Sequence, residues 1–356
     1  MSKSIFPELL LDWYEPKRRP LPWKDISDPY LIWLSEIILQ QTRVAQGLPY
    51  FEAFRRSFPT VASLASASED EIFKHWEGLG YYARARNLHR AAKQVVAVFG
   101  GQFPTTYKEL LSLPGVGPYT AAAIASFAYG LPHAVLDGNV FRVLSRFFDI
   151  DLPIDSTIGK KAFQQLAQEL LPEEQSAFYN QAMMDLGATV CTPQSPLCQT
   201  CPMYEHCQAY QKGITALRPV KSKRIAIKNR YFNFLVINHR GESLLQQRTA
   251  NDIWNGLYQF PLIETPTAIE QFEDILQHDT FPEWLPTAAI TSHQHGGSYT
   301  QQLTHQRIHA RFWHINLLPE CELKTAAIFT RAEPKNWCNF AFPKVISWFI
   351  DEKQLH

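Results

Sequence analysis

Hydrophobic positions in the first 212 residues recur mostly at a spacing of three to four, and the apolar segments break at Pro and Gly. This spacing gathers apolar side chains on one face of a helix, whereas strand-like alternation is scarce. The region is therefore predicted to be mainly α-helical. The helices expected span residues 29–46, 69–75, 83 onward, 106–113, 118–130, 138 onward and 174–187.

The pattern changes after about residue 230. Residues 231–238 are aromatic and β-branched, and residues 307–317 alternate between apolar and polar, which is typical of strands. We therefore predict three parts: a helical region at 1–212, a linker at 213–229 and an α+β domain at 230–356. From Arg218 to Arg230 there are six basic residues and no acid, so this stretch is either a solvated tether or a phosphate contact. These basic residues are Arg218, Lys221, Lys223, Arg224, Lys228 and Arg230.

Composition limits the class of protein. The chain has 356 residues, 46% of them hydrophobic, with 34 Lys and Arg balanced by 34 Asp and Glu. A net charge of zero argues against a uniformly basic nucleic-acid binder, but it leaves room for a local basic face. Residues 1–17 lack the apolar core of a signal peptide, and no run reaches membrane-spanning length. We expect a cytoplasmic protein, nucleoid-associated if bacterial, with reduced thiols.

Four of the six cysteines lie within seventeen residues, as Cys191-x6-Cys198-x2-Cys201-x5-Cys207. Four thiolates this close suit a tetrahedral zinc or an iron–sulfur cluster. Zinc ribbons usually bring together two Cys-x-x-Cys pairs, and only one is present, so the spacing favours a [4Fe–4S] cluster. Cys321 and Cys338 have no metal-like spacing and are interpreted as packing residues.

Two carboxylates are candidates for chemistry. Glu36 lies within an apolar helical run, where desolvation would raise its pKa toward that of a general acid; the alternative is an exposed Glu beside Arg43. Asp137 precedes a predicted helix and is most simply its N-cap. An acid paired with an anion that stabilises a sugar cation is also the arrangement used to cleave glycosidic bonds. The sequence alone does not bring the two together.

Two glycine-containing loops are candidates for contact with nucleic acid. The run Leu113-Pro114-Gly115-Val116-Gly117 joins two predicted helices, and its backbone amides could bind a phosphate. An ordinary helix–turn–helix corner is equally compatible. The run from Gly78 to Tyr82 presents Leu79 and Tyr81 beside a basic helix that carries Arg84, Arg86, Arg90 and Lys93. Such residues could be wedges in a base stack, or they could pack beneath the helix.

Taken together, these motifs resemble the helix–hairpin–helix DNA glycosylases with an iron–sulfur loop, and most closely the MutY family of adenine DNA glycosylases. The resemblance covers nearly the whole chain. It depends on six motifs: Leu21-Pro22-Trp23, Ser35 to Thr42, Gly78 to Tyr82, Leu113 to Tyr119, Leu136 to Val140 and the cysteine loop.

The resemblance implies removal of adenine mispaired with 8-oxoguanine (or guanine) in duplex DNA, after the base is flipped into a pocket. Glu36 would protonate the base, Asp137 would stabilise or trap the sugar cation, and Tyr119 and Asn139 would orient them. The adenine pocket would comprise Arg19, Leu21, Trp23 and Gln181. Contacts to the oxidised guanine and the wedge would come from Gln41, Thr42, Leu79 and Tyr81, and Gly115 and Gly117 would bind backbone. The enzyme would act as a monomer, with duplex DNA as its partner and no membrane attachment.

Residue 119 separates the alternatives within this superfamily. In endonuclease III a Lys at the matching position forms a Schiff base and cleaves the strand, which a Tyr lacks the amine to do. A monofunctional glycosylase is therefore expected. The C-terminal part resembles the family's Nudix-like 8-oxoguanine recognition domain, and it lacks the acidic cluster that binds magnesium in true Nudix hydrolases. Thr304 and His305 lie where the family reads the lesion. Two rivals remain: a pyrimidine-lesion glycosylase with lyase activity, and a non-catalytic DNA-binding module.

Overall fold

The computed structural model describes residues 2–222, 226–323 and 329–353. Contacts between residues group the chain into two units: Met1–Ala67 with Arg86–Arg224, and Ser68–Ala85 with Ile225–His356. We call the first the helical unit and the second the sheet unit, and describe each by itself. Within the described residues no helix combines the length and the apolar character needed to cross a bilayer.

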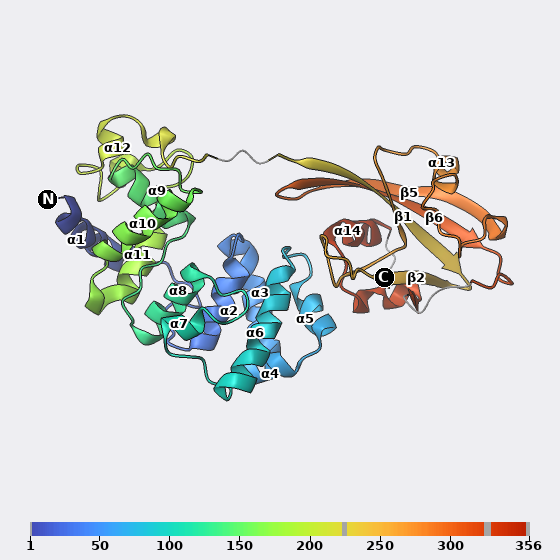
Figure 1. The fold of residues 1–356 in the computed structure, drawn as a ribbon, viewed down its shortest axis with the longest axis horizontal. Coiled ribbons are helices and arrows are strands. Elements are labelled where there is room, and N and C mark those ends of the chain that lie inside the picture. The colour runs from blue at the N-terminus through green and yellow to red at the C-terminus, as the bar shows by residue number, and fades with distance from the viewer. Residues whose placement is uncertain (1, 223–225, 324–328, 354–356) are drawn as a thin grey trace. The chain divides into compact units, whose positions relative to one another are not determined.

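Most of the helices predicted from the sequence lie in the helical unit (Figure 1), while the predicted helix at 69–75 belongs to the sheet unit and the one at 106–113 ends at Leu110. Residues 29–46 form two helices rather than one, because Gln41 adopts a left-handed φ of 57° that a right-handed helix cannot accommodate. The helices are α1 Ser2–Tyr14, α2 Pro29–Leu39, α3 Val44–Ser57, α4 Val61–Ser66, α6 Ala83–Phe99, α7 Tyr107–Leu110, α8 Pro118–Tyr129, α9 Gly138–Phe147, α10 Thr157–Leu170, α11 Ser176–Thr189 and α12 Gln208–Gln211.

Polar caps determine where several of these helices begin. The side chains of Asp28, Thr106 and Asp137 accept backbone N–H groups at the starts of α2, α7 and α9. Each such cap contributes about 1 kcal/mol to helix stability. Gly130 ends α8 with a φ of 66°, as expected for a C-terminal glycine. The predicted cap at residue 137 is therefore confirmed, and Thr106 caps α7 in the same way.

The core of the helical unit lies where α1, α9 and α11 meet. Phe6 of α1 packs edge-on against Phe147 of α9 with 4.7 Å between ring centroids, and Leu186 of α11 is buried in the same cluster. A Cβ on Gly187 would lie 2.5 Å from the Cβ of Asn139, so only glycine lets α11 approach the start of α9 this closely. This packing places residues of α11 beside Asp137 and Asn139.

A single mixed sheet forms the centre of the sheet unit. The strands follow the order β3-β2-β1-β6-β5, while β4 pairs with β1 and β7 with β2; only β1 and β6 run parallel. The strands are β1 Lys228–His239, β2 Glu242–Gln247, β3 Tyr258–Gln259, β4 Leu262–Thr265, β5 Ile290–Gln302, β6 Gln306–Leu317 and β7 Phe329–Ala332. The helices are α5 Glu69–Trp76, α13 Phe272–Leu276 and α14 Lys344–Glu352. The predicted α+β class is confirmed.

Helices cover both faces of this sheet. Phe312 of β6 stacks on Phe349 of α14 at 4.1 Å between centroids, and the next residue, Trp313, contacts Phe272 of α13 at 5.5 Å. Because successive residues of a strand point to opposite faces, α14 and α13 lie on opposite sides. The sheet is therefore the middle of three layers.

Residues 68–85 group with the sheet unit, although they precede it by more than a hundred residues. Lys74 of α5 donates a hydrogen bond to the Phe340 carbonyl at 3.3 Å, and the Phe342 amide donates to Glu77 at 3.2 Å. The predicted division had assigned this segment to the helical region. Local sequence pattern carries no information about such long-range contacts.

The predicted linker is partly anchored rather than free. Arg218 pairs with Asp149 at 2.8 Å, and the Ser222 amide donates to Asp155 at 2.9 Å, both within the helical unit. At the other end Arg230 is only 10% exposed in its side chain and pairs with Asp252 and Glu264 in the sheet unit. Lys223 and Arg224 lie outside the described residues. The interpretation of this stretch as a solvated tether is therefore wrong for Arg218 and Arg230, which are ion-paired and largely buried.

Candidate active site

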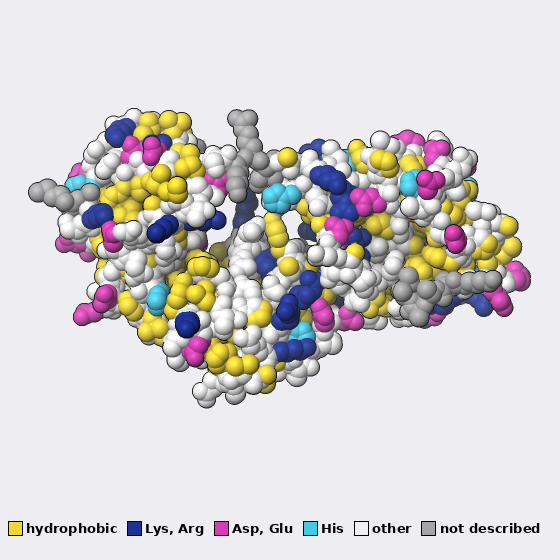
Figure 2. Space-filling view, viewed as in Figure 1, with side chains coloured by type: hydrophobic (Ala, Val, Ile, Leu, Met, Phe, Trp, Pro, Cys, Tyr) yellow, Lys and Arg dark blue, Asp and Glu magenta, His cyan; other side chains and the backbone are white. Residues whose placement is uncertain are grey.

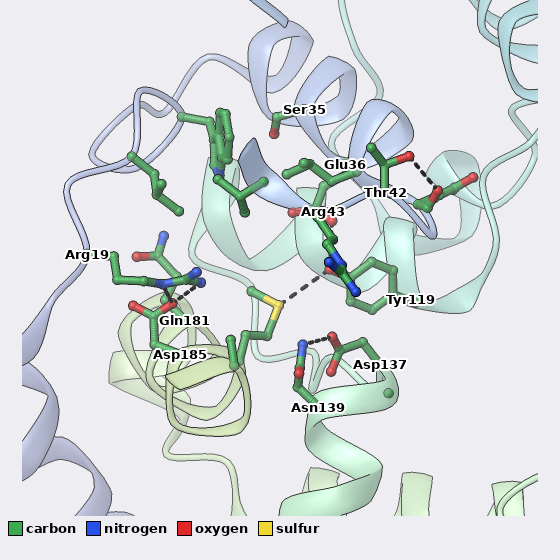
Figure 3. A pocket seen from close by; sticks show the side chains of 18 of the residues that line it. Arg19, Ser35, Glu36, Thr42, Arg43, Tyr119, Asp137, Asn139, Gln181 and Asp185 are labelled. Carbon is green, nitrogen blue, oxygen red and sulfur yellow. Dashed lines mark hydrogen bonds and ion pairs between the residues drawn. The ribbon is translucent and has the colours of Figure 1, made fainter. Parts of the chain in front are cut away.

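One cavity of about 850 Å³ in the helical unit brings together side chains from α2, α8, α9 and α11 (Figure 3). Glu36 and Asp137, a hundred residues apart in the chain, both line it. Ten of the residues predicted for the site lie on its wall. They are Arg19, Leu21, Trp23, Glu36, Gln41, Thr42, Tyr119, Asp137, Asn139 and Gln181.

Glu36 lies on α2 with 8% of its surface exposed. Burial raises the pKa of its carboxyl from 4.5 to about 7, and the nearby Asp137 raises it as well. The Tyr119 hydroxyl opposes this shift by donating a hydrogen bond of 2.7 Å to Oε2. A carboxyl group in this environment exchanges its proton near neutral pH, as a general acid must.

Asp137 serves as the N-cap of α9 and also faces the cavity. Its Oδ1 accepts the Val140 amide at 2.8 Å, and its Oδ2 accepts Asn139 Nδ2 at 2.7 Å. Burial raises the pKa of Asp137, while these two donors and the charge of Arg142 lower it. The structural and chemical interpretations of Asp137 are therefore compatible, because capping holds the carboxylate at the cavity wall.

Arg142, which was not predicted from the sequence, connects this carboxylate to the cysteine loop. The guanidinium donates to Asn139 Oδ1 at 2.8 Å and to the Cys191 carbonyl at 2.6 Å. It is only 8% exposed. The orientation of Asn139, and through it Asp137, thus depends on the backbone at the first cysteine.

The four cysteines of the loop line one small cavity of about 30 Å³, together with Arg146. Burial raises the pKa of Cys201 to about 12, so a thiolate there requires a cation nearby. In the described residues, no three His, Cys, Asp or Glu side chains are placed to hold one metal ion. Four thiols around one cavity are a donor set that can hold a zinc ion or an iron–sulfur cluster. The donor set therefore fits an iron–sulfur cluster.

The hairpin between α7 and α8 has the geometry expected of a phosphate-binding turn. Gly115 has a φ of 76°, and a Cβ there would lie 2.8 Å from Asn87 Cβ. Gly117 is the N-cap of α8, with open space where a side chain would project. The amides of both glycines find no acceptor within the described parts of the chain. They remain available at the positive end of a helix dipole.

The remaining predicted residues lie in the sheet unit. Tyr81 is 46% exposed with a φ of 51°, and its hydroxyl hydrogen-bonds to that of Thr304. His305, the residue after Thr304, is also exposed. Leu79, in contrast, is 5% exposed, so it does not project as a wedge in this structure. Of the two wedge candidates, only Tyr81 faces outward.

The basic helix is less uniformly exposed than its sequence suggests. Dark blue Lys and Arg side chains are visible on the face of the helical unit shown in Figure 2. Arg90 and Lys93 of α6 are exposed, but Arg84 is 9% exposed and donates to the Gly80 carbonyl at 3.1 Å. Arg84 therefore supports the Gly78–Tyr82 loop instead of joining the basic surface.

A second group of polar residues at the cavity was not predicted from the sequence. Asp185 of α11 and Lys24 both line it, and Asp185 is ion-paired with Lys24 and Arg19. A signal was present, because Asp185 follows Ala182-Met183-Met184 and precedes Leu186. This is the same pattern, a carboxylate in an apolar helix, that singled out Glu36.

Three protein-family models match the chain. Residues 34–173 match the HhH-GPD superfamily of base excision DNA repair proteins, residues 191–207 the iron–sulfur binding domain of endonuclease III, and residues 233–352 the NUDIX domain. These three matches cover, in the same order, most of the helical region that forms the cavity, the cysteine loop and the sheet unit.

Curated relatives narrow the family further. The adenine DNA glycosylase of Buchnera aphidicola subsp. Schizaphis graminum is 37% identical over 269 residues, which cover 74% of this chain and 77% of that protein. The chain belongs to the adenine DNA glycosylase family. The family's human member is 45% identical over 218 residues, covering 59% of this chain and 40% of the human protein. As a member, this chain is a DNA glycosylase with an iron–sulfur binding domain.

Solved structures agree with the helical fold of the family. A thermostable thymine-DNA glycosylase matches with a TM-score of 0.56 at 31% identity, covering 59% of this chain and 97% of its own. An endonuclease III–DNA complex matches with a TM-score of 0.53 at 21% identity, covering 60% and 99%. The second likeness concerns the fold alone.

Proposed function

We propose that this enzyme removes adenine mispaired with 8-oxoguanine or guanine from duplex DNA, without cleaving the strand. The observation that carries the proposal is the shared cavity, in which a carboxyl group with a pKa of about 7 and a second, donor-stabilised carboxylate both face one space. Membership of the adenine DNA glycosylase family identifies adenine as the base that is removed.

Glu36 is the general acid. Tyr119 occupies its Oε2, so the acidic proton is carried by Oε1, the oxygen left for the substrate. With a pKa of about 7, roughly half of the enzyme carries this proton at neutral pH. Transfer of the proton to adenine N7 makes the base a neutral leaving group, and the glycosidic bond then breaks with its electron pair on the base.

Asp137 stabilises the positive charge that develops on the sugar. The Val140 amide and Asn139 hold its two oxygens, which keeps an anion fixed at the wall of the cavity. A fixed negative charge in such a site stabilises a cationic transition state without having to reorganise. Water, or transiently Asp137 itself, then captures the sugar cation.

The absence of strand cleavage follows from the amines near the cavity. Position 119 is a tyrosine, which cannot form a Schiff base. Lys24 is the one lysine that lines the cavity among the described residues, and its ammonium is ion-paired with Asp185 and hydrogen-bonded to Tyr14. A protonated, paired amine is a poor nucleophile, which supports monofunctional chemistry.

Recognition of the opposite base is assigned to the sheet unit. Tyr81, Thr304 and His305 present hydroxyl, imidazole and ring surfaces, and the hydrogen bond between Tyr81 and Thr304 holds two of them together. This contact supports the assignment of residues 303–305, which rests otherwise on sequence position. The amides of Gly115 and Gly117 would bind the DNA backbone.

Cys191, Cys198, Cys201 and Cys207 would hold a [4Fe–4S] cluster. Bound there, the cluster would supply a rigid centre for a loop that lacks long helices. Arg146 donates hydrogen bonds to the Thr192 carbonyl at 2.7 Å and the Thr215 carbonyl at 3.0 Å, so the chain itself ties both ends of the loop. Broad visible absorption of the purified protein would separate an iron–sulfur cluster from colourless zinc.

The experiment is a single-turnover assay on duplexes with adenine opposite 8-oxoguanine, guanine or thymine, with and without alkali. We expect adenine release opposite the first two, and strand breaks only after alkali treatment. Strand breaks without alkali, together with borohydride trapping, would favour the endonuclease III type of chemistry. DNA binding with no base release would favour a non-catalytic module.

A further inference from the structure

A third carboxylate, that of Asp185, lies on the wall formed by α11 (Figure 3). Its side chain is 1% exposed, and it holds two cations: Oδ1 accepts Arg19 Nε at 2.7 Å and Oδ2 accepts Lys24 Nζ. Both cations come from the irregular segment between Lys17 and Pro29. One anion of a packed helix therefore anchors a segment that is itself neither helix nor strand.

A chain of hydrogen bonds runs from Asp185 through Lys24 and Tyr14 to Gln181, and each donor in it is determined by the one before. Lys24 Nζ lies 2.9 Å from the Tyr14 hydroxyl, and an ammonium can only donate, so the Tyr14 oxygen accepts. Tyr14 has a single proton, which it donates to Gln181 Oε1 at 3.2 Å. Burial and then Asp185 raise the pKa of Tyr14 to about 12, so the phenol keeps that proton. Gln181 is thereby oriented with its Nε2 as the donor left for a ligand.

Arg19 and Gln181 consequently offer N–H groups on the same wall of the cavity. A guanidinium has five donors and no acceptor, and its Nε is already bound to Asp185. Gln181 offers the amide nitrogen that Tyr14 leaves available. The natural partners of such donors in a purine are the unprotonated ring nitrogens.

We propose that Asp185, Lys24 and Tyr14 form a buried clasp that holds Arg19 and Gln181 as hydrogen-bond donors toward the ring nitrogens of the bound adenine. The clasp deepens the proposed function and rests on it, since it assumes that adenine occupies this cavity. Asp185, Lys24 and Tyr14 are positioning residues, because they act through Arg19 and Gln181. Together they determine which ring atoms contribute to selectivity.

Three features make the clasp dependent on all its members. Lys24 is 6% exposed in its side chain, so without Asp185 its charge would be buried and unpaired. Arg19 is 29% exposed and would turn toward solvent once released. Among the described residues, the Tyr14 hydroxyl is the one hydrogen-bond partner of the Gln181 amide, so its loss would leave the two ends of that amide undistinguished. Each loss alters the donors offered to the base while leaving Glu36 and Asp137 in place.

The test combines variants of the full-length protein with analogues of the substrate adenine, in the manner of a double-mutant cycle. Single-turnover rates are measured for adenine, 1-deazaadenine and 3-deazaadenine opposite 8-oxoguanine, using wild-type, Tyr14→Phe and Asp185→Asn proteins. Replacing a ring nitrogen by C–H removes one acceptor, and its intrinsic effect on leaving-group reactivity is the same in every protein. We expect at least one analogue to cost the wild type about 10-fold, the value of one lost hydrogen bond. The penalty should shrink to about 2-fold in both variants.

Tyr179→Phe provides the matched control. Tyr179 is on the same helix and 2% exposed, and its hydroxyl has no hydrogen-bond partner in the described residues, so this variant should keep the full penalty. An unchanged penalty in Tyr14→Phe and Asp185→Asn would overturn the clasp, as would a wild type that is indifferent to both analogues. If Asp185→Asn does not fold, Tyr14→Phe and Lys24→Met still decide. Failure of the wild type to release adenine itself would instead refute the proposed function.

Discussion

Glu36 and Asp185 lie on two walls of one cavity, and both carboxylates are almost fully buried. Their neighbours differ. Glu36 faces a neutral phenol and a second carboxylate and forms no ion pair in the described residues, whereas Asp185 is paired with Arg19 and Lys24. The same side-chain chemistry thus yields a proton donor on one wall and a permanent anchor on the other.

Burial alone therefore does not make a carboxyl group catalytic. Desolvation disfavours the charged form, and the partners then decide whether that cost is offset. At Glu36 no cation from the described part of the chain offsets the desolvation cost, so the carboxyl group keeps its proton near neutral pH and can donate that proton to the substrate. At Asp185 two cations offset it, and the charge serves to hold a segment in place.

The largest expected effect is on catalysis. Glu36→Gln should lower the single-turnover rate of adenine release by about 10²- to 10⁴-fold, because it removes the acidic proton and little shape. Duplex binding, measured by a mobility shift, should change little. Glu173→Gln, at an exposed site outside the cavity, is the control. A near-normal rate would exclude Glu36 from the mechanism.

The next effect concerns stability and the other carboxylate. Asp185→Asn should reduce the free energy of unfolding by about 3–5 kcal/mol, because it leaves the Lys24 charge buried without a partner. Urea denaturation of the full chain at pH 7, followed by the helical circular dichroism signal, measures this loss. A variant as stable as the wild type would contradict the role of Asp185 as the partner that offsets the buried charge of Lys24.

Glu36→Gln should have the opposite effect on stability. The folded-state pKa of about 7 exceeds the ordinary value of 4.5, so the folded protein binds the proton more tightly and loses stability as pH rises from about 4.5 through 7. The 2.5-unit difference corresponds to about 3 kcal/mol above pH 7, which a glutamine does not lose. Relative to wild type, the variant should therefore gain stability between pH 5 and pH 8. A constant difference across that range would contradict the shifted pKa.

The smallest effect tests the contact between Tyr119 and Glu36. The phenol donates to Oε2 and lowers the pKa of Glu36, so Tyr119→Phe should raise that pKa further. The acid would then stay protonated to higher pH, and the alkaline limb of the rate profile should shift upward by about one unit or less. A limb that stays in place or moves down would show that Tyr119 acts by another route.

Local pattern was sufficient for much of this protein. The helical period, the caps at Thr106 and Asp137, the strands of the sheet unit and the cysteine spacing could all be predicted, because each depends on neighbours within a few residues. Glu36 was also recognisable, since a carboxylate in an apolar helix stands out. The end of α2 was missed because the left-handed backbone of Gln41 leaves no mark on the hydrophobic period.

Long-range contacts decided the rest. Asp185 showed the same local pattern as Glu36, but its partners come from a segment 160 residues earlier and only the folded chain identifies them. Arg142 likewise gains its role from Asn139 and Cys191, and Leu79 is buried despite its glycine-flanked loop. By itself the sequence determined which groups were available and how each element would form. The tertiary structure decided which carboxylate holds a proton and which holds a charge, because the free energy of a buried charge depends on what lies beside it.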